Sequence, residues 1–237
     1  MPRLKTMKIR KLKSSKLFYN KWPYKIACYI EGANRLTYLG ADSVRLFCSE
    51  KPSEAMPYWM RKSKLSKEDK AQLLQFTNNV EPFLTIKDQV QIRGEGRHFN
   101  LFCKDFELLE TIHKALEPWV IDVYGPTTKE ELDFMLDNGH KKILRDVLPK
   151  DGYRYKVYFK DRWPVHDRKE FIIWADKFPE KISITDGSRK WVNGDNWTYN
   201  PFMYVKDDKT LSIVGLMISG HVKKVEEFVL REKLVPA

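Results

Sequence analysis

The residues best suited to chemistry are five histidines, and their spacing argues against a metal site. No two lie at the HxH or i, i+4 spacing of metal ligands. They are His98, His113, His140, His166 and His221. The chain also contains no P-loop, GxGxxG, GxSxG or paired CxxC motif. We therefore expect neither a metal nor a cofactor.

Two catalytic arrangements remain open as alternatives. Arg97 and His98 beside Glu95 offer the acid–base pair of a metal-independent nuclease that uses His98. CRISPR RNA-processing nucleases with tandem ferredoxin-like units and a lone catalytic histidine are similar, although their Gly-rich C-terminal loop is missing here. Four aspartates offer carboxylates for a two-metal site, but each is better explained as a helix cap. They are Asp122, Asp161, Asp207 and Asp208.

The net charge points to an anionic partner. The 43 Lys and Arg residues exceed the 32 Asp and Glu residues, which gives a formal charge of +11 and favours association with polyanions. No acidic residue occurs before Glu31, and we interpret residues 1–22 as a basic N-terminal arm. Within this arm, Arg10, Lys11 and Lys13 are expected to contact phosphates.

The cysteines and the hydropathy bound the compartment. No apolar run approaches the length of a membrane span, and no secretory h-region follows the basic start. Cys28, Cys48 and Cys103 lie in apolar contexts without CxxC spacing, which is typical of reduced core residues. We expect an intracellular protein of a reducing compartment, cytoplasm or nucleus, that is neither secreted nor bound to a membrane.

A short phrase recurs roughly every 50 residues and suggests repeated units. In each copy an apolar strand is followed by an acidic residue, which can cap the first turn of a helix. The copies are Leu46-Phe47-Cys48-Ser49-Glu50, Leu101-Phe102-Cys103-Lys104-Asp105, Val157-Tyr158-Phe159-Lys160-Asp161 and Met203-Tyr204-Val205-Lys206-Asp207.

The order of expected elements also repeats. Residues 23–125 contain an alternating strand at 24–31, helices, a hairpin at 89–103, a helix that begins at Asp105 and a strand at 119–124. Residues 126–151 are expected to form a helical connector. Residues 152–237 repeat the order, with a strand at 153–160, a helix at 166–175, a hairpin that turns at Asn193-Gly194-Asp195, and a helix from Asp207 or Asp208. The fold class is therefore α+β, with two tandem ferredoxin-like β-α-β-β-α-β units.

Strand alternation leaves one face of each sheet without helices, and that face is rich in rings and cations. Rings provide surfaces on which bases stack, and Lys and Arg bind phosphates. The candidate binding residues are Lys25, Tyr29, Arg93, His98 and Phe102 in the first unit and Arg154, Lys156, Tyr158, Trp197 and Tyr204 in the second.

This arrangement resembles the RNA-recognition-motif type of fold in its topology and residue types. It differs in the segments His98-Phe99-Asn100-Leu101-Phe102 and Asn200-Pro201-Phe202-Met203-Tyr204, which lack the Gly-rich, basic opening of the usual RNP1 octamer. The resemblance implies RRM-like units that present stacking aromatics to RNA.

The function expected from the sequence is non-catalytic binding of nucleic acid, with single-stranded RNA or DNA preferred. The main alternative is an assembly protein, viral or other, whose basic arm contacts a genome. A third expectation is a protein partner or self-association through the aromatic cluster between Trp191 and Tyr204, because so many rings cannot all be buried in a small sheet.

Overall fold

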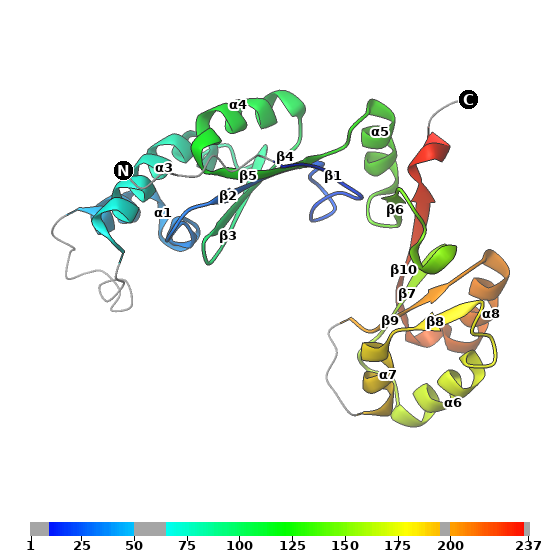
Figure 1. The fold of residues 1–237 in the computed structure, drawn as a ribbon. Helices are drawn as coiled ribbons and strands as arrows, with labels where there is room; N and C mark the ends of the chain where they lie inside the picture. Colours follow the sequence, from blue (N-terminus) through cyan, green and yellow to red (C-terminus); the bar gives the residue numbers. More distant parts are fainter. Residues whose placement is uncertain (1–9, 50–64, 195–199, 235–237) are drawn as a thin grey trace. The chain divides into compact units, whose positions relative to one another are not determined.

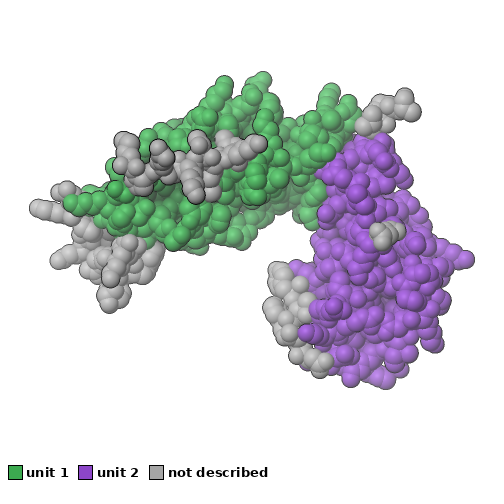
Figure 2. Space-filling model, viewed as in Figure 1, with its two compact units in different colours: residues 1–132 green, residues 133–237 purple. Residues whose placement is uncertain are grey.

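A computed structural model of the chain describes residues 10–49, 65–194 and 200–234. The chain divides into two compact units, residues 1–132 and residues 133–237 (Figure 2). Each unit contains a five-stranded sheet, and the described residues include seven α-helices in all, so the fold is mixed α+β (Figure 1). None of these helices is long and apolar enough to span a bilayer.

Unit 1 begins with an edge strand and then combines strands with three helices. Its elements are β1 (Arg10–Lys13), β2 (Tyr24–Tyr29), α1 (Asn34–Cys48), α3 (Lys67–Leu84), β3 (Val90–Glu95), β4 (His98–Cys103), α4 (Phe106–Leu116) and β5 (Val120–Gly125). The strand order is β1-β5-β2-β4-β3. Strand β1 runs parallel to β5, and the other neighbours are antiparallel.

Unit 2 has the same kind of sheet. Helix α5 (Lys129–Asn138) spans the boundary between the units. It is followed by β6 (Lys142–Arg145), β7 (Tyr155–Phe159), α6 (Val165–Ala175), β8 (Ile182–Ile184), α7 (Asp186–Asn193), β9 (Phe202–Val205), α8 (Asp208–Ile218) and β10 (Val222–Leu230). The strand order is β6-β10-β7-β9-β8, and only β6 is parallel to its neighbour, β10.

The two sheets therefore have the same strand order and the same strand directions. When the strands of each unit are numbered in chain order, both sheets read first, fifth, second, fourth, third. In each sheet the edge strand that comes first in the chain pairs with the strand that comes last. The second strand lies at the centre of the sheet and has neighbours on both sides.

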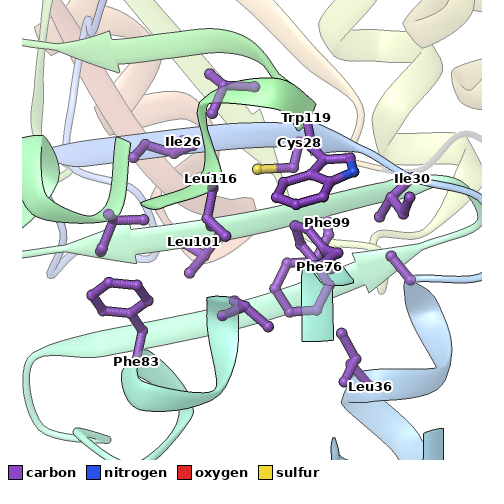
Figure 3. Packing of buried hydrophobic residues seen from close by; sticks show 14 of the residues in the cluster. Ile26, Cys28, Ile30, Leu36, Phe76, Phe83, Phe99, Leu101, Leu116 and Trp119 are labelled. Atoms are coloured by element: carbon purple, nitrogen blue, oxygen red, sulfur yellow. The ribbon is translucent and has the colours of Figure 1, made fainter. Parts of the chain in front are cut away.

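The core of unit 1 lies between the sheet and helices α1, α3 and α4. Alternating residues of the central strands point into it, among them Ile26 and Cys28, as the sequence predicts. Three rings meet edge to face in this core: Phe76 lies 5.3 Å from Phe99 and 5.4 Å from Trp119, centroid to centroid (Figure 3). All three cysteines are free thiols, and Cys28 and Cys103 are buried here as expected.

The core of unit 2 is built around a group of rings between the sheet and helices α6, α7 and α8. Phe159 stacks on Trp191 at 5.8 Å with an interplanar angle of 6°, and Trp163 packs against both. Trp191 is thus a buried core residue. The predicted exposed cluster between Trp191 and Tyr204 is divided, because Phe202 and Tyr204 lie on the opposite face of the sheet.

Two of the four repeated phrases behave as predicted. The Asp105 and Asp207 carboxylates cap α4 and α8 by accepting hydrogen bonds from the N–H groups of Leu108 (2.7 Å) and Thr210 (2.8 Å). The capping box that begins at Ser66 is also present at the start of α3. Each of these caps satisfies N–H groups that the first helical turn leaves without a partner.

The other two phrases correct the prediction. Residues 46–48 end helix α1 rather than a strand, because Phe47 faces the core from the helix; Glu50 lies outside the described residues. The third phrase does end strand β7, but Asp161 is not a cap. Helix α6 begins only after Pro164 and has no side-chain cap at its N-terminus.

Two expected elements have a different secondary structure. The Asn193-Gly194 pair does not turn a hairpin: it ends helix α7, and Gly194 adopts the left-handed conformation (φ 83°) that closes many helices. The same dipeptide suits both structures because both require a positive φ. Residues 142–145 form strand β6 where we expected a helix, since Ile143 and Leu144 are buried beside β10.

The basic segment before β2 is part of the folded unit from residue 10 onward. Residues 10–13 form β1, which the sequence analysis did not predict. Residues 14–22, called the covering loop below, turn through Tyr19 and Asn20, both with positive φ, and close with an antiparallel bridge between Phe18 and Trp22.

The cap of α8 gives a pH-dependent prediction. Hydrogen bonds from the Thr210 N–H and hydroxyl lower the pKa of Asp207. Replacing Asp207 with Ala should reduce the free energy of unfolding at pH 7 by about 1 kcal/mol. Because the folded pKa is depressed, this loss should be complete above the unfolded pKa of about 4 and vanish as the pH falls through the lower folded value. Urea unfolding between pH 2 and 7 measures it.

The matched control is Asp207→Asn, because Asn caps helices about as well as Asp and does not titrate. It should retain most of the stability and lose the difference between neutral and acid pH. Equal losses for Ala and Asn at pH 7 would contradict the capping role.

Candidate nucleic-acid interface

The face of the unit 1 sheet that lies opposite its helices is called the outer face below. Strand register places its side chains in rows that cross the sheet. One row reads Tyr124, Lys25, Phe102, Gln91, and the next reads Asp122, Ala27, Asn100, Arg93. The predicted candidates Lys25, Arg93 and Phe102 therefore do meet on one face.

Lys25 lies at the centre of this face and is surrounded by rings. Its ammonium nitrogen is 4.8 Å from the ring centroid of Tyr124 and 6.0 Å from those of Phe102 and Phe18. Burial lowers the pKa of Lys25, although the carboxylates of Asp122 and Glu95 act in the opposite direction. Rings attract a cation through their negative faces, so this lysine keeps a favourable environment while it is half-buried.

The covering loop lies across part of the outer face. Phe18 and Tyr19 contact the Phe102 ring at centroid distances of 5.5 and 5.0 Å, and Arg93 donates a hydrogen bond to the Tyr19 hydroxyl (2.7 Å). Phe102 is only 4% exposed as a result. Its predicted stacking surface is therefore covered by the chain's own rings, and Tyr19 offers an exposed ring in its place.

The three predicted arm residues lie in strand β1. The Arg10 guanidinium donates to both carboxylate oxygens of the buried Asp122 (2.7 and 3.1 Å), so its charge is already paired. Lys11 and Lys13 are exposed. They also border a separate groove of about 420 Å³ between β1, β5 and α4.

Tyr29 and His98 pair at the edge of the outer face, with ring centroids 5.6 Å apart, and both are exposed. Arg97 donates to the Tyr29 hydroxyl (3.0 Å) and forms an ion pair with Glu31 (2.6 Å), whereas Glu95 pairs with Arg93. In the described part of the chain His98 has no hydrogen bond to an acid. The geometry therefore gives no support to a nuclease centred on His98.

Unit 2 carries a corresponding set of residues on its outer face. The Lys156 ammonium lies 3.7 Å from the Phe202 ring centroid and 4.7 Å from that of Tyr158. Strand register places Tyr204 directly opposite Lys156. The candidates Lys156, Tyr158 and Tyr204 are thus brought together, and Phe202 joins them.

Tyr158 is buried on this face, and its hydroxyl is hydrogen-bonded to a buried acid. Its hydroxyl donates to the Glu226 carboxylate (2.9 Å), which also accepts from the Lys224 ammonium (2.7 Å). Burial, and then the neighbouring Glu226 charge, raise the pKa of Tyr158, so its hydroxyl remains protonated and donates at neutral pH. Glu226 and Lys224 were not among the predicted residues, although their alternation along residues 222–230 places them on one face of the strand.

Arg154 and Trp197 are the remaining candidates. Arg154 is held by ion pairs to Glu227 (2.6 Å) and Asp208 (2.9 Å) at the start of the second unit's central strand. Trp197 lies outside the described residues.

The outer face of unit 1 is hollowed into a pocket of about 640 Å³, called the outer-face pocket below. Its charged lining residues are Lys13, Lys16, Lys25, Arg93 and Glu95. Its rings are Phe18, Tyr19, Phe102 and Tyr124, and Asn100 adds an amide. Such a pocket, with cations and rings together, suits a planar anionic ligand.

Among the described residues there is no cluster of three or more His, Cys, Asp or Glu side chains that could hold a metal ion. The aspartates weighed for a two-metal site are dispersed: Asp122 pairs with Arg10, Asp207 caps α8, and Asp208 accepts from Arg154. Asp122 lies within strand β5 rather than at a helix start, so the capping explanation is wrong for this residue.

Comparison of the chain with protein-family models, with curated proteins and with solved structures finds no match.

The buried hydrogen bond of Tyr158 provides a test of the outer face of unit 2. Replacing Tyr158 with Phe leaves the Glu226 carboxylate buried with one donor fewer, and should lower the free energy of unfolding by about 1–3 kcal/mol. The matched control is Tyr153→Phe, whose hydroxyl donates to the neutral carbonyl of Pro179 (2.9 Å). That change should cost only about 0.5–1.5 kcal/mol in urea unfolding. A smaller loss for Tyr158 than for Tyr153 would contradict the charged network.

Proposed function

We propose that this chain binds single-stranded nucleic acid through the outer faces of its two sheets, without catalysing a reaction. The observation that carries the proposal is a half-buried lysine among aromatic rings on the central strand of each sheet: Lys25 in β2 and Lys156 in β7. A lysine beside rings supplies a phosphate contact next to surfaces on which bases stack. The net charge of +11 favours the same class of partner.

We further propose that each unit is ferredoxin-like, with one extra edge strand. If β1 and β6 are set aside, the remaining strands read fourth, first, third, second in both sheets, and the helices cover one face only. This arrangement leaves the other face available to a ligand. It supports a protein built from two RRM-like repeats.

Single strands are preferred in this proposal because the available rings must meet unpaired bases. Tyr19 and Tyr29 are exposed in unit 1, and Phe202 and Tyr204 are half-buried in unit 2. A duplex presents phosphates to a sheet but keeps its bases stacked inside, so it would use only the cations.

The proposal predicts the behaviour of a double variant. Lys25→Gln with Lys156→Gln should weaken single-strand binding similarly for all sequences, and should reduce the slope of log K against log salt by about two, because two phosphate contacts are lost. The measurement is fluorescence anisotropy with labelled single-stranded and duplex RNA and DNA at several salt concentrations.

The control for this experiment is Lys114→Gln with Lys169→Gln. It removes the same charge from exposed positions of helices α4 and α6. An equal effect of both double variants would mean that overall charge alone drives binding, and an equal affinity for single strands and duplex would sink the stacking argument.

Self-association is a second candidate, favoured by an apolar helix face of unit 2. Helix α8 exposes Leu216 (85%) together with Ile213 and Met217, on the side of the unit opposite the outer face. An exposed apolar patch is typical of a contact surface. Self-association through it would leave the outer face of that unit open.

Light scattering with size exclusion, in the absence of nucleic acid, tests this second candidate. The native chain should have a mass above 28.2 kDa that rises with concentration, and Leu216→Gln with Met217→Gln should return it to the monomer. A concentration-independent monomer would exclude the assembly function for this face.

A further inference from the structure

Among the differences between the two outer faces, one pair of equivalent positions lies next to the central lysine. Tyr24-Lys25-Ile26 on β2 corresponds to Tyr155-Lys156-Val157 on β7, because Lys25 is in register with Phe102 and Lys156 with Tyr204. Two residues further along the central strand, Ala27 faces Asn100 in unit 1 and Tyr158 faces Phe202 in unit 2. Unit 1 thus has two small side chains where unit 2 has two rings.

In unit 2 these rings fill the face. Phe202 packs on Tyr158 with 5.7 Å between centroids and an angle of 48°, and the Lys156 ammonium lies over the Phe202 ring. In unit 1 the space next to Lys25 and Asn100 belongs to the outer-face pocket. Unit 2 therefore displays, within the protein, the contacts that an external ring would make with Lys25.

Two polar groups of the pocket have no hydrogen-bond partner within the described residues, although rings surround the first of them, the Lys25 ammonium. The Lys25 ammonium has no hydrogen bond and no carboxylate at ion-pair distance, although it is half-buried. The Asn100 amide, also half-buried, makes no hydrogen bond. Both groups line the outer-face pocket and are only half-buried, so a ligand that supplies an anion and a hydrogen-bonding edge can reach both of them.

We propose that the outer-face pocket binds one nucleotide, whose base occupies the space that Tyr158 and Phe202 fill in unit 2. The base lies beside Lys25 and presents its edge to Asn100, and the phosphate contacts the Lys25 ammonium together with other cations of the wall, among them Lys16 and Arg93. This inference rests on the proposed function and names the unit of the strand that unit 1 recognises. An asparagine amide offers one donor and one acceptor, which match the N6 and N7 of adenine.

Calorimetric titration of the full chain with mononucleotides tests the pocket. Adenosine 5′-monophosphate should bind about tenfold more tightly than purine riboside 5′-monophosphate, because the latter lacks the N6 donor that bonds to the amide oxygen. Adenosine and ribose 5-phosphate should each bind at least about tenfold more weakly than the nucleotide, since each lacks one half of the contacts. Displacement of adenosine 5′-monophosphate by an oligoadenylate would identify the ligand as one unit of a strand, and no displacement would identify a free nucleotide.

The decisive variant transfers the pair of unit 2 into unit 1. Ala27→Tyr with Asn100→Phe should fill the pocket and reduce nucleotide binding at least about tenfold. Ala71→Tyr, at an exposed position of α3, is the control and should bind like the native chain. Should the double variant fail to fold, Asn100→Ala keeps the pocket open and should remove the preference for adenosine 5′-monophosphate over purine riboside 5′-monophosphate while retaining phosphate-dependent binding.

The outcomes separate this inference from the proposed function. Oligonucleotide binding without mononucleotide binding, or nucleotide binding that Ala27→Tyr with Asn100→Phe leaves intact, would overturn the pocket and leave the proposed function standing. Mononucleotide binding without oligonucleotide binding would overturn the proposed function and keep the pocket. Binding of neither would overturn both.

Discussion

A lysine at the middle of each sheet must keep its charge in a place with little water, and much of the surrounding structure follows from this constraint. Lys25 and Lys156 lie on central strands and are flanked by aromatic rings, so each is half-buried. Desolvation disfavours an ammonium group, and ring faces and nearby carboxylates compensate for it. In unit 1 the covering loop contributes Phe18 to this environment. In unit 2 the neighbouring strand β9 contributes Phe202.

The two units surround the central lysine with different interactions. In unit 2 Tyr158 and the buried Glu226 lie next to the lysine, and the hydrogen bonds of Glu226 with Tyr158 and Lys224 hold this face together. In unit 1 the nearby Asp122 is already engaged by Arg10, and a loop from outside the sheet packs on the rings. One face is closed by its own side chains, and the other retains a pocket. An identical strand order therefore does not imply an identical surface.

Local signals in the sequence were reliable where one interaction decides the structure. The caps Asp105 and Asp207 each satisfy helix N–H groups within three residues, so their neighbours alone reveal them. Strand alternation at Ile26 and Cys28 likewise follows from burial of one face. The hairpin predicted at Asn193-Gly194 was wrong, because a positive φ is required both in a hairpin turn and at a helix end.

The features that local sequence patterns did not predict depend on partners that are distant in the chain. Strand β1 exists because residues 10–13 pair with residues 122–125, and β6 because it pairs with β10. Burial of Phe102 depends on a loop that precedes it by about eighty residues. Alternation correctly assigned Phe102 to the outer face, but no local pattern reports what covers that face.

The pairing of the first strand of each unit with its last has a consequence for synthesis on the ribosome. Strand β1 cannot pair until β5 has emerged, because β5 is its only neighbour among the strands that the structure describes. Contacts of such long sequence separation form late, since the entropy of closing the loop is lost before they stabilise the chain. The same holds for β6 and β10. Each sheet can thus form completely only after the final strand of its own unit has been synthesised. The sheet of the first unit can therefore be complete before the second unit exists.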